Sequence, residues 1–304
     1  MSSMSLPSYL MPVDPRHNAA ATDRPLLPEP LPAFLMRLLA PVEAQRGAAR
    51  LALVEPDGRE ISALLVQNGR ICYVERTRTG AEATALLSQE DPEMLALVGR
   101  ITRAAHGKFA TFSSLVRASP EAPFDRVREF LLAHTVRGIL GLAWEAAGLP
   151  LELRRTARYT GVFDPEMSFS PLEGYLKAVR ALDISTPDLA TSLFERLGEH
   201  YDQALLLERE TDGNFYPTHW RFAKRKAAPE RLSDLTSRIE ALASLPAPRL
   251  LARGLASRIA SYPGPAGCWL LVPQPHRQAW FHFEGNGALP RALLAVVAEM
   301  ESLD

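Results

Sequence analysis

A short run of cations is the first feature of the sequence with evident chemistry. Arg221, Lys224, Arg225 and Lys226 lie within six residues, between an expected hairpin and an expected helix. Such a run is often a solvated loop. It also suits an acidic partner, because a cationic segment steers and orients a surface rich in carboxylates. We take these four residues as the candidate partner-binding residues.

A second pair of cations, Arg154 and Arg158, is separated by three residues. Guanidinium groups grip phosphates through paired N–H donors and stack on aromatic rings. The Arg-x-x-x-Arg spacing resembles that of the arginines with which PilZ domains bind cyclic-di-GMP. The second motif of that family, Asp/Asn-x-Ser-x-x-Gly, does not occur nearby, and 30 of the 34 basic residues are arginine. Nucleotide sensing through Arg154 and Arg158 is therefore the alternative hypothesis.

The other reactive side chains form no familiar catalytic or metal-binding motif. The sequence has no P-loop, Rossmann glycine fingerprint, Gly-x-Ser-x-Gly elbow, His-Glu-x-x-His helix or Cys-x-x-Cys pair. The seven histidines stand singly, without metal-ligand spacing: His17, His106, His134, His200, His219, His276 and His282. We expect no catalytic residue, metal or cofactor, and an enzyme of unfamiliar type is the third hypothesis.

Composition and charge narrow the class of protein. Of the 304 residues, 47% are hydrophobic and 23% are charged, as in an ordinary folded protein. The formal net charge is −1, so no overall field draws the chain to nucleic acid or to an anionic membrane. No apolar run approaches the roughly 20 residues of a membrane-spanning helix. We expect protein partners, no nucleic acid and no membrane insertion.

The cysteines and the N-terminal segment indicate a cytoplasmic location. Cys72 and Cys268 lie in apolar runs far apart in the sequence, as expected of reduced, buried thiols. Residues 1–30 are rich in proline and have no cationic stretch before their apolar residues, so they lack the pattern of a signal peptide. We expect them to form a flexible leader.

The first part of the chain is expected to combine a helix, a β-meander and further helices. An amphipathic helix is predicted from Leu31, and Asn68-Gly69 is a strong signal for a two-residue hairpin turn. The meander strands are predicted at 50–55, 60–67 and 71–76. Helices are predicted at 80–88, 92–103, 125–143 and 171–182, with a strand at 149–157. The helix at 125–143 is apolar on two sides, which is typical of a helix between two layers.

The second part is expected to have the element order α-β-β-α-β-β-α. Thr186-Pro187-Asp188 marks a helix start, and Thr211-Asp212-Gly213-Asn214 marks a hairpin. Helices are also predicted at 229–245, 248–260 and 289–303, and strands at 204–210, 215–222, 268–272 and 278–283. The sequence thus predicts an α+β protein with a leader at 1–30 and two domains at 31–183 and 184–304.

The first domain resembles the PATAN family (DUF4388), which occurs in bacterial response regulators and many myxobacterial proteins. The resemblance rests on LPAFLMRLL, ARLALVEPDGRE, LLVQNGRICYVE and GAEATALL, and on FDPEMSFSPLEGYLKAVRALD as the closing helix. A Gly-Arg-Ile step ends the hairpin in that family, and a Gly-x-x-Ala-x-x-x-Leu segment opens the next helix. The matching residues are Gly69, Arg70 and Ile71, then Gly80, Ala83 and Leu87.

The second domain is similar in element order to the roadblock/LC7 fold, a small sheet flanked by helices. Members of that family usually carry three strands after the middle helix, and this sequence offers two. The resemblance implies a dimerisation or docking platform, in some bacteria for a small Ras-like GTPase. We therefore expect a non-catalytic bacterial signalling or scaffold protein that docks a GTPase or a response regulator, with a homodimer through the second domain as an option.

Overall fold

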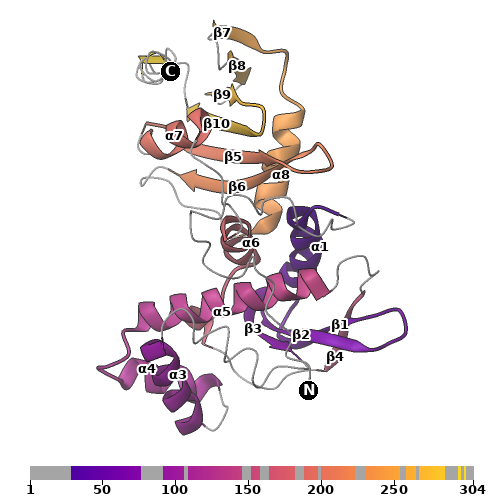
Figure 1. Cartoon of the computed structure of the whole chain (residues 1–304), viewed down its shortest axis with the longest axis vertical. Helices are drawn as coiled ribbons and strands as arrows, with labels where there is room; N and C mark the ends of the chain where they lie inside the picture. Colours follow the sequence, from indigo (N-terminus) through magenta and orange to yellow (C-terminus); the bar gives the residue numbers. More distant parts are fainter. Residues whose placement is uncertain are drawn as a thin grey trace, which may run out of the picture.

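The computed structural model describes residues 29–76, 92–105, 109–145, 152–157, 164–181, 188–197, 200–222, 231–253, 258–264, 267–284, 294, 295 and 298. Helices accompany two antiparallel sheets, which confirms the α+β class in two parts (Figure 1). The predicted helices at 80–88 and 289–303, the leader and the predicted boundary at 183 lie wholly or largely outside the described residues.

The first sheet, sheet A, has four strands in the order β3-β2-β1-β4. Its strands are β1 (Ala48–Val54), β2 (Glu60–Gln67), β3 (Arg70–Arg76) and β4 (Glu152–Ala157). Helix α1 (Leu31–Glu43) precedes them and buries one apolar side, including Leu35 and Leu39. The predicted hairpin turn is confirmed, because Asn68 and Gly69 have φ values of 50° and 77°.

Among the described residues, three helices lie between β3 and β4, and the next α-helix after β4 is α6. They are α3 (Pro92–Ala104), α4 (Phe109–Ala118), α5 (Phe124–Glu145) and α6 (Pro171–Arg180). Helix α5 buries Leu132 and Ile139 in the cluster that covers sheet A, and Val127 in a second cluster with α3 and α4. The prediction of a helix between two layers is confirmed.

The second sheet, sheet B, has six strands in the order β6-β5-β10-β9-β8-β7. They are β5 (Gln203–Arg209), β6 (Phe215–Phe222), β7 (Arg249–Arg253), β8 (Arg258–Gly264), β9 (Gly267–Pro273) and β10 (Arg277–Glu284). Helix α7 (Leu189–Arg196) packs on one face, where Phe194 and Phe281 are buried together. Helix α8 (Leu232–Ala243) packs on the other, against Trp269 and Trp280.

The prediction of a helix at 248–260 is wrong. This segment contains β7 and the start of β8, from Arg258 to Ala260. Strands β7 and β8 pair antiparallel, and β8 pairs in turn with β9. Its Ala, Leu and Arg residues favour a helix intrinsically. Pairing at the sheet edge and burial of Ile259 in the sheet core outweigh that preference. Four strands of the described part of the chain therefore follow α8, where the sequence indicated two.

The two parts share one hydrophobic cluster. It contains Leu35 of α1 and Tyr175 of α6 together with Trp220 of β6 and Leu235 of α8. Helix α6 lies between the two sheets (Figure 1) and contacts α1, α5 and β6. Polar contacts strengthen this junction, because the Glu43 carboxylate accepts hydrogen bonds from the first backbone N–H groups of α8.

No helix within the described ranges is long and apolar enough to cross a membrane.

Candidate functional site

Arg221, the first residue of the predicted basic patch, lies on edge strand β6 beside α7. Its Nη2 atom donates hydrogen bonds to both carboxylate oxygens of Glu195, at 2.8 and 2.9 Å. Its guanidinium carbon lies 4.9 Å from the centre of the Phe194 ring, a cation–π contact. Arg221 is thus held by contacts within the chain. The other three residues of the patch, Lys224, Arg225 and Lys226, lie outside the described residues.

A second arginine, Arg180, lies near Arg221. It is the last residue of α6, and both the burial of its guanidinium and the positive charge of Arg221 lower its pKa. Sequence reasoning missed Arg180, because a basic residue in the last turn of a helix is the ordinary complement to the helix dipole. The structure therefore places two cations and one carboxylate, that of Glu195, at the junction of α6, α7 and β6.

The hydroxyl of Tyr201 completes this group. Tyr201 is 1% exposed, and its ring packs against Phe281. Burial raises its pKa, and the nearby charge of Arg221 and a hydrogen bond with Arg221 oppose that rise. Arg180 Nε is buried and has no hydrogen-bond partner in the described structure. We call Arg180, Glu195, Tyr201 and Arg221 the Arg180 cluster.

Of the two arginines of the alternative nucleotide site, the structure describes only Arg154. Arg154 lies on β4, an edge strand of sheet A, where it is exposed and faces Ala52 across the antiparallel pair. Arg158 lies outside the described residues. Whether the two guanidinium groups converge on one ligand stays a prediction.

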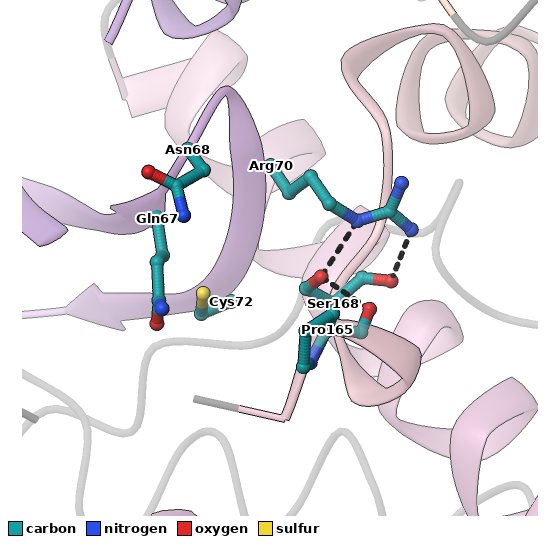
Figure 2. A pocket seen from close by; sticks show the side chains of 6 residues that line it. All are labelled: Gln67, Asn68, Arg70, Cys72, Pro165 and Ser168. Carbon is teal, nitrogen blue, oxygen red and sulfur yellow. Dashed lines mark hydrogen bonds between the residues drawn. The ribbon is translucent and has the colours of Figure 1, made fainter. Parts of the chain in front are cut away.

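A small pocket lies where the β2–β3 hairpin meets the short 3-10 helix η2 (Pro165–Met167), and Figure 2 shows the side chains around it. Arg70 reaches across to Ser168, donating from Nε to the hydroxyl at 2.7 Å and from Nη2 to the carbonyl at 2.9 Å (Figure 2). The volume is about 40 Å³, room for about three water molecules. A nucleotide does not fit in this pocket.

The residues Gly69, Arg70 and Ile71 have structural roles beside this pocket. Gly69 has positive φ, and a Cβ there would lie 3.0 Å from the Glu43 carbonyl oxygen, so glycine suits the turn. Arg70 holds the segment after η2 through Ser168. Ile71 exchanges two backbone hydrogen bonds of 2.8 Å with Phe169. Arg70 and Ile71 therefore fasten the hairpin to the segment that leads into α6, and Gly69 makes the turn that precedes them.

Cys72 lines this pocket, and we expect it to be chemically inert. It is 4% exposed, and burial raises its pKa to about 12, so at pH 8 it holds about a thousandfold less thiolate than a thiol of pKa 9.0. Peptide-level mass spectrometry after iodoacetamide treatment at pH 8 should find Cys72 unmodified and the half-buried Cys268 modified faster. Equal rates at the two cysteines would contradict this prediction.

Two comparisons with known proteins identify no relative of this chain. A scan against protein-family models finds no match, and a search of curated proteins finds no significant match. Within the part of the chain that the structure describes, no three His, Cys, Asp or Glu side chains gather as metal ligands would.

Proposed function

We propose that the protein is a non-catalytic bacterial signalling or scaffold protein of the cytoplasm that docks other proteins. The observation that carries the proposal is the free edge of sheet B. Strand β7 is the last strand of that sheet and pairs on one side only, with β8, among the described strands. Its outer side therefore offers backbone donors and acceptors to an incoming strand.

The side chains of β7 suit a protein partner. Leu250 is 45% exposed and is the one large hydrophobic side chain that stands exposed in the described ranges. Arg249 and Arg253 are exposed on the same strand. An apolar anchor flanked by cations fits a partner strand that has an apolar residue between acidic ones. The same cations hinder unspecific pairing of sheet edges.

The family resemblances support the same reading. Among the described residues, the four strands β7 to β10 follow α8, one more than the three that members of the roadblock family usually carry, and β8, β9 and β10 supply three neighbouring strands of that kind. Helix α1 and the β1–β3 meander occupy three of the segments on which the PATAN resemblance rests, and GAEATALL lies outside the described residues. We therefore propose a small Ras-like GTPase or a response regulator as the partner, and a second copy of the chain as a further binding partner.

Affinity capture with the full-length tagged protein tests this function. We expect the wild type to retain a GTPase or a response regulator from native extract. Leu250→Asp should lower that retention at least tenfold, because it places a charge at the centre of the contact. Ala118→Asp adds the same charge to an exposed position of α4 and should retain the partner fully.

Two outcomes would contradict the proposal. If Leu250→Asp retains the partner as well as Ala118→Asp does, then β7 is not the docking edge. If the purified protein, added to the extract, converts a compound of the extract into a product, then it is an enzyme. Thermal unfolding of both variants serves as the folding control, since neither replaces a buried side chain.

A further inference from the structure

We propose that Arg253 and Arg258 form a binding site for the phosphate group of a phosphorylated, extended segment of the docking partner. The two residues are direct partners in the antiparallel pairing of β7 with β8, at the outer end of sheet B (Figure 1). We call them the arginine pair. The proposal rests on the docking function of β7 and adds the chemical group that the partner presents there.

Two like charges face each other in the arginine pair. Residues directly opposite in an antiparallel ladder have Cβ atoms about 4.5–5.5 Å apart, and like charges in these positions are destabilising. Both arginines are exposed, and neither forms a hydrogen bond or an ion pair with any residue that the structure describes. Two positive charges therefore lie close together and open to solvent, without a carboxylate of the described chain to neutralise them.

Both arginines lie on one face of sheet B. Ile259 of β8 is buried in the cluster on the α7 side, and Tyr262 of the same strand packs against the cluster on the α8 side. Because side chains alternate between the two faces along a strand, Arg258 lies on the same face as Tyr262. Arg253 shares this face, since it is directly opposite Arg258. The two guanidinium groups can therefore bind one ligand together.

An apolar side chain lies beside the arginine pair on that face. Leu250 is directly opposite Ala260, which is two residues from Arg258 on β8. Two residues on the same face of a strand are about 7 Å apart. Leu250 is also 45% exposed and lies on the strand whose outer side is free to pair. A segment that pairs with β7 through its backbone can thus place an apolar side chain on Leu250 and an anionic side chain on the arginine pair.

A phosphate group matches the charge and the donors of the arginine pair. A phosphorylated side chain carries about −1.5 to −2 charges at pH 7 and has three strong acceptor oxygens. Each guanidinium group carries one positive charge and a planar fork of N–H donors that binds phosphate oxygens in pairs. One phosphate group therefore neutralises both arginines, whereas a single carboxylate leaves one of the two charges uncompensated.

Fluorescence anisotropy of a fluorescein-labelled peptide with the full-length protein tests the site. The peptide Gly-Thr-Leu-Thr-phosphoserine-Thr-Gly has its apolar and phosphorylated side chains two residues apart, so they share one face of a strand. Two companion peptides carry serine or glutamate in place of phosphoserine. We expect the wild type to bind the phosphopeptide at least tenfold more tightly than the serine peptide and several-fold more tightly than the glutamate peptide.

Arg253→Met and Arg258→Met should each weaken phosphopeptide binding at least tenfold. Arg249→Met is the matched control, because it removes one guanidinium group from the same strand but is opposite Ser261, on the α7 side. It should change the affinity less than twofold. All three arginines are exposed, so the variants should fold, and thermal unfolding checks this.

Four results would overturn the proposal. Equal affinity for the phosphopeptide and the glutamate peptide would show a site for any acidic side chain. Equal losses in Arg249→Met and Arg253→Met would show an unspecific charge effect. Binding of inorganic phosphate as tightly as the phosphopeptide would assign the arginine pair to a free anion. Tighter binding to vesicles that contain phosphatidic acid would assign it to a membrane surface.

The capture experiment with native extract separates this proposal from the docking function on which it rests. If Leu250→Asp loses the partner and both Arg253→Met and Arg258→Met retain it fully, then β7 is the docking edge and the phosphate site is wrong. If Leu250→Asp retains the partner, then the docking edge itself is wrong. Loss of the partner in all three variants, with full retention in Arg249→Met, supports both proposals.

Discussion

Replacing Gly267 with alanine is expected to lower the free energy of unfolding by about 3 kcal/mol or more, the upper end of the range for single substitutions. Gly267 opens β9 opposite Glu284 of β10 and has a φ of 155°, a conformation that residues with a side chain rarely adopt. An added Cβ would lie 2.1 Å from the backbone oxygen of Phe283. Because that oxygen belongs to the backbone, only a shift of the strand can relieve the clash.

Urea denaturation followed by tryptophan fluorescence measures this effect, since Trp269 and Trp280 lie in the two strands concerned. Gly99→Ala is the matched control. A Cβ at Gly99 in helix α3 meets no atom within 4 Å, so this change should stabilise the helix by about 0.5–1 kcal/mol. Equal urea midpoints for Gly267→Ala and the wild type would show that β9 and β10 are not joined at Gly267 as described.

The parts of the fold that the sequence predicted well are those set by local patterns. Asn68-Gly69 specified its turn because the two residues tolerate positive φ. A helix start was predicted at Thr186-Pro187-Asp188 with Thr186 as the N-cap, and the N-cap of α7 is instead Asp188, whose carboxylate accepts a hydrogen bond from Thr191 N–H. The two apolar sides of α5 correctly predicted two packing partners. Each of these signals lies within one continuous segment of the sequence.

Features that depend on distant segments were not predictable in this way. Strand β7 has a helix-favouring composition, and only its neighbour β8 makes it a strand. The candidate site has the same limit. Arg180 and Arg221 are far apart in the sequence, and the packing of α6 against β6 brings them near enough for the charge of Arg221 to lower the pKa of Arg180. Nothing in either local sequence marks this proximity, so the sequence singled out Arg154, Arg158 and the basic run at 221–226 but not Arg180.

Tyr175 is expected to be the side chain that most strongly couples the two parts. It is fully buried between α6 and β6, in the cluster shared by both parts, and its hydroxyl donates to the Pro217 carbonyl at 3.0 Å. Burial raises the pKa of Tyr175, so the hydroxyl stays protonated and remains a donor throughout the physiological range. Tyr175→Ala should lower the free energy of unfolding by about 3–5 kcal/mol, the cost of removing a large aromatic side chain from a core.

Tyr175→Phe separates the hydrogen bond from the packing. It keeps the ring but leaves the Pro217 carbonyl without this donor, so a loss of about 1–3 kcal/mol is expected. If the shared cluster couples the two parts, both variants should shift a single urea transition, seen alike by tryptophan fluorescence of sheet B and by far-ultraviolet circular dichroism of the whole chain. Two separate transitions in the wild type, with only one moved by Tyr175→Ala, would show instead that each part unfolds on its own. The buried contact of α6 with β6 would then add to the stability of one part without joining it to the other.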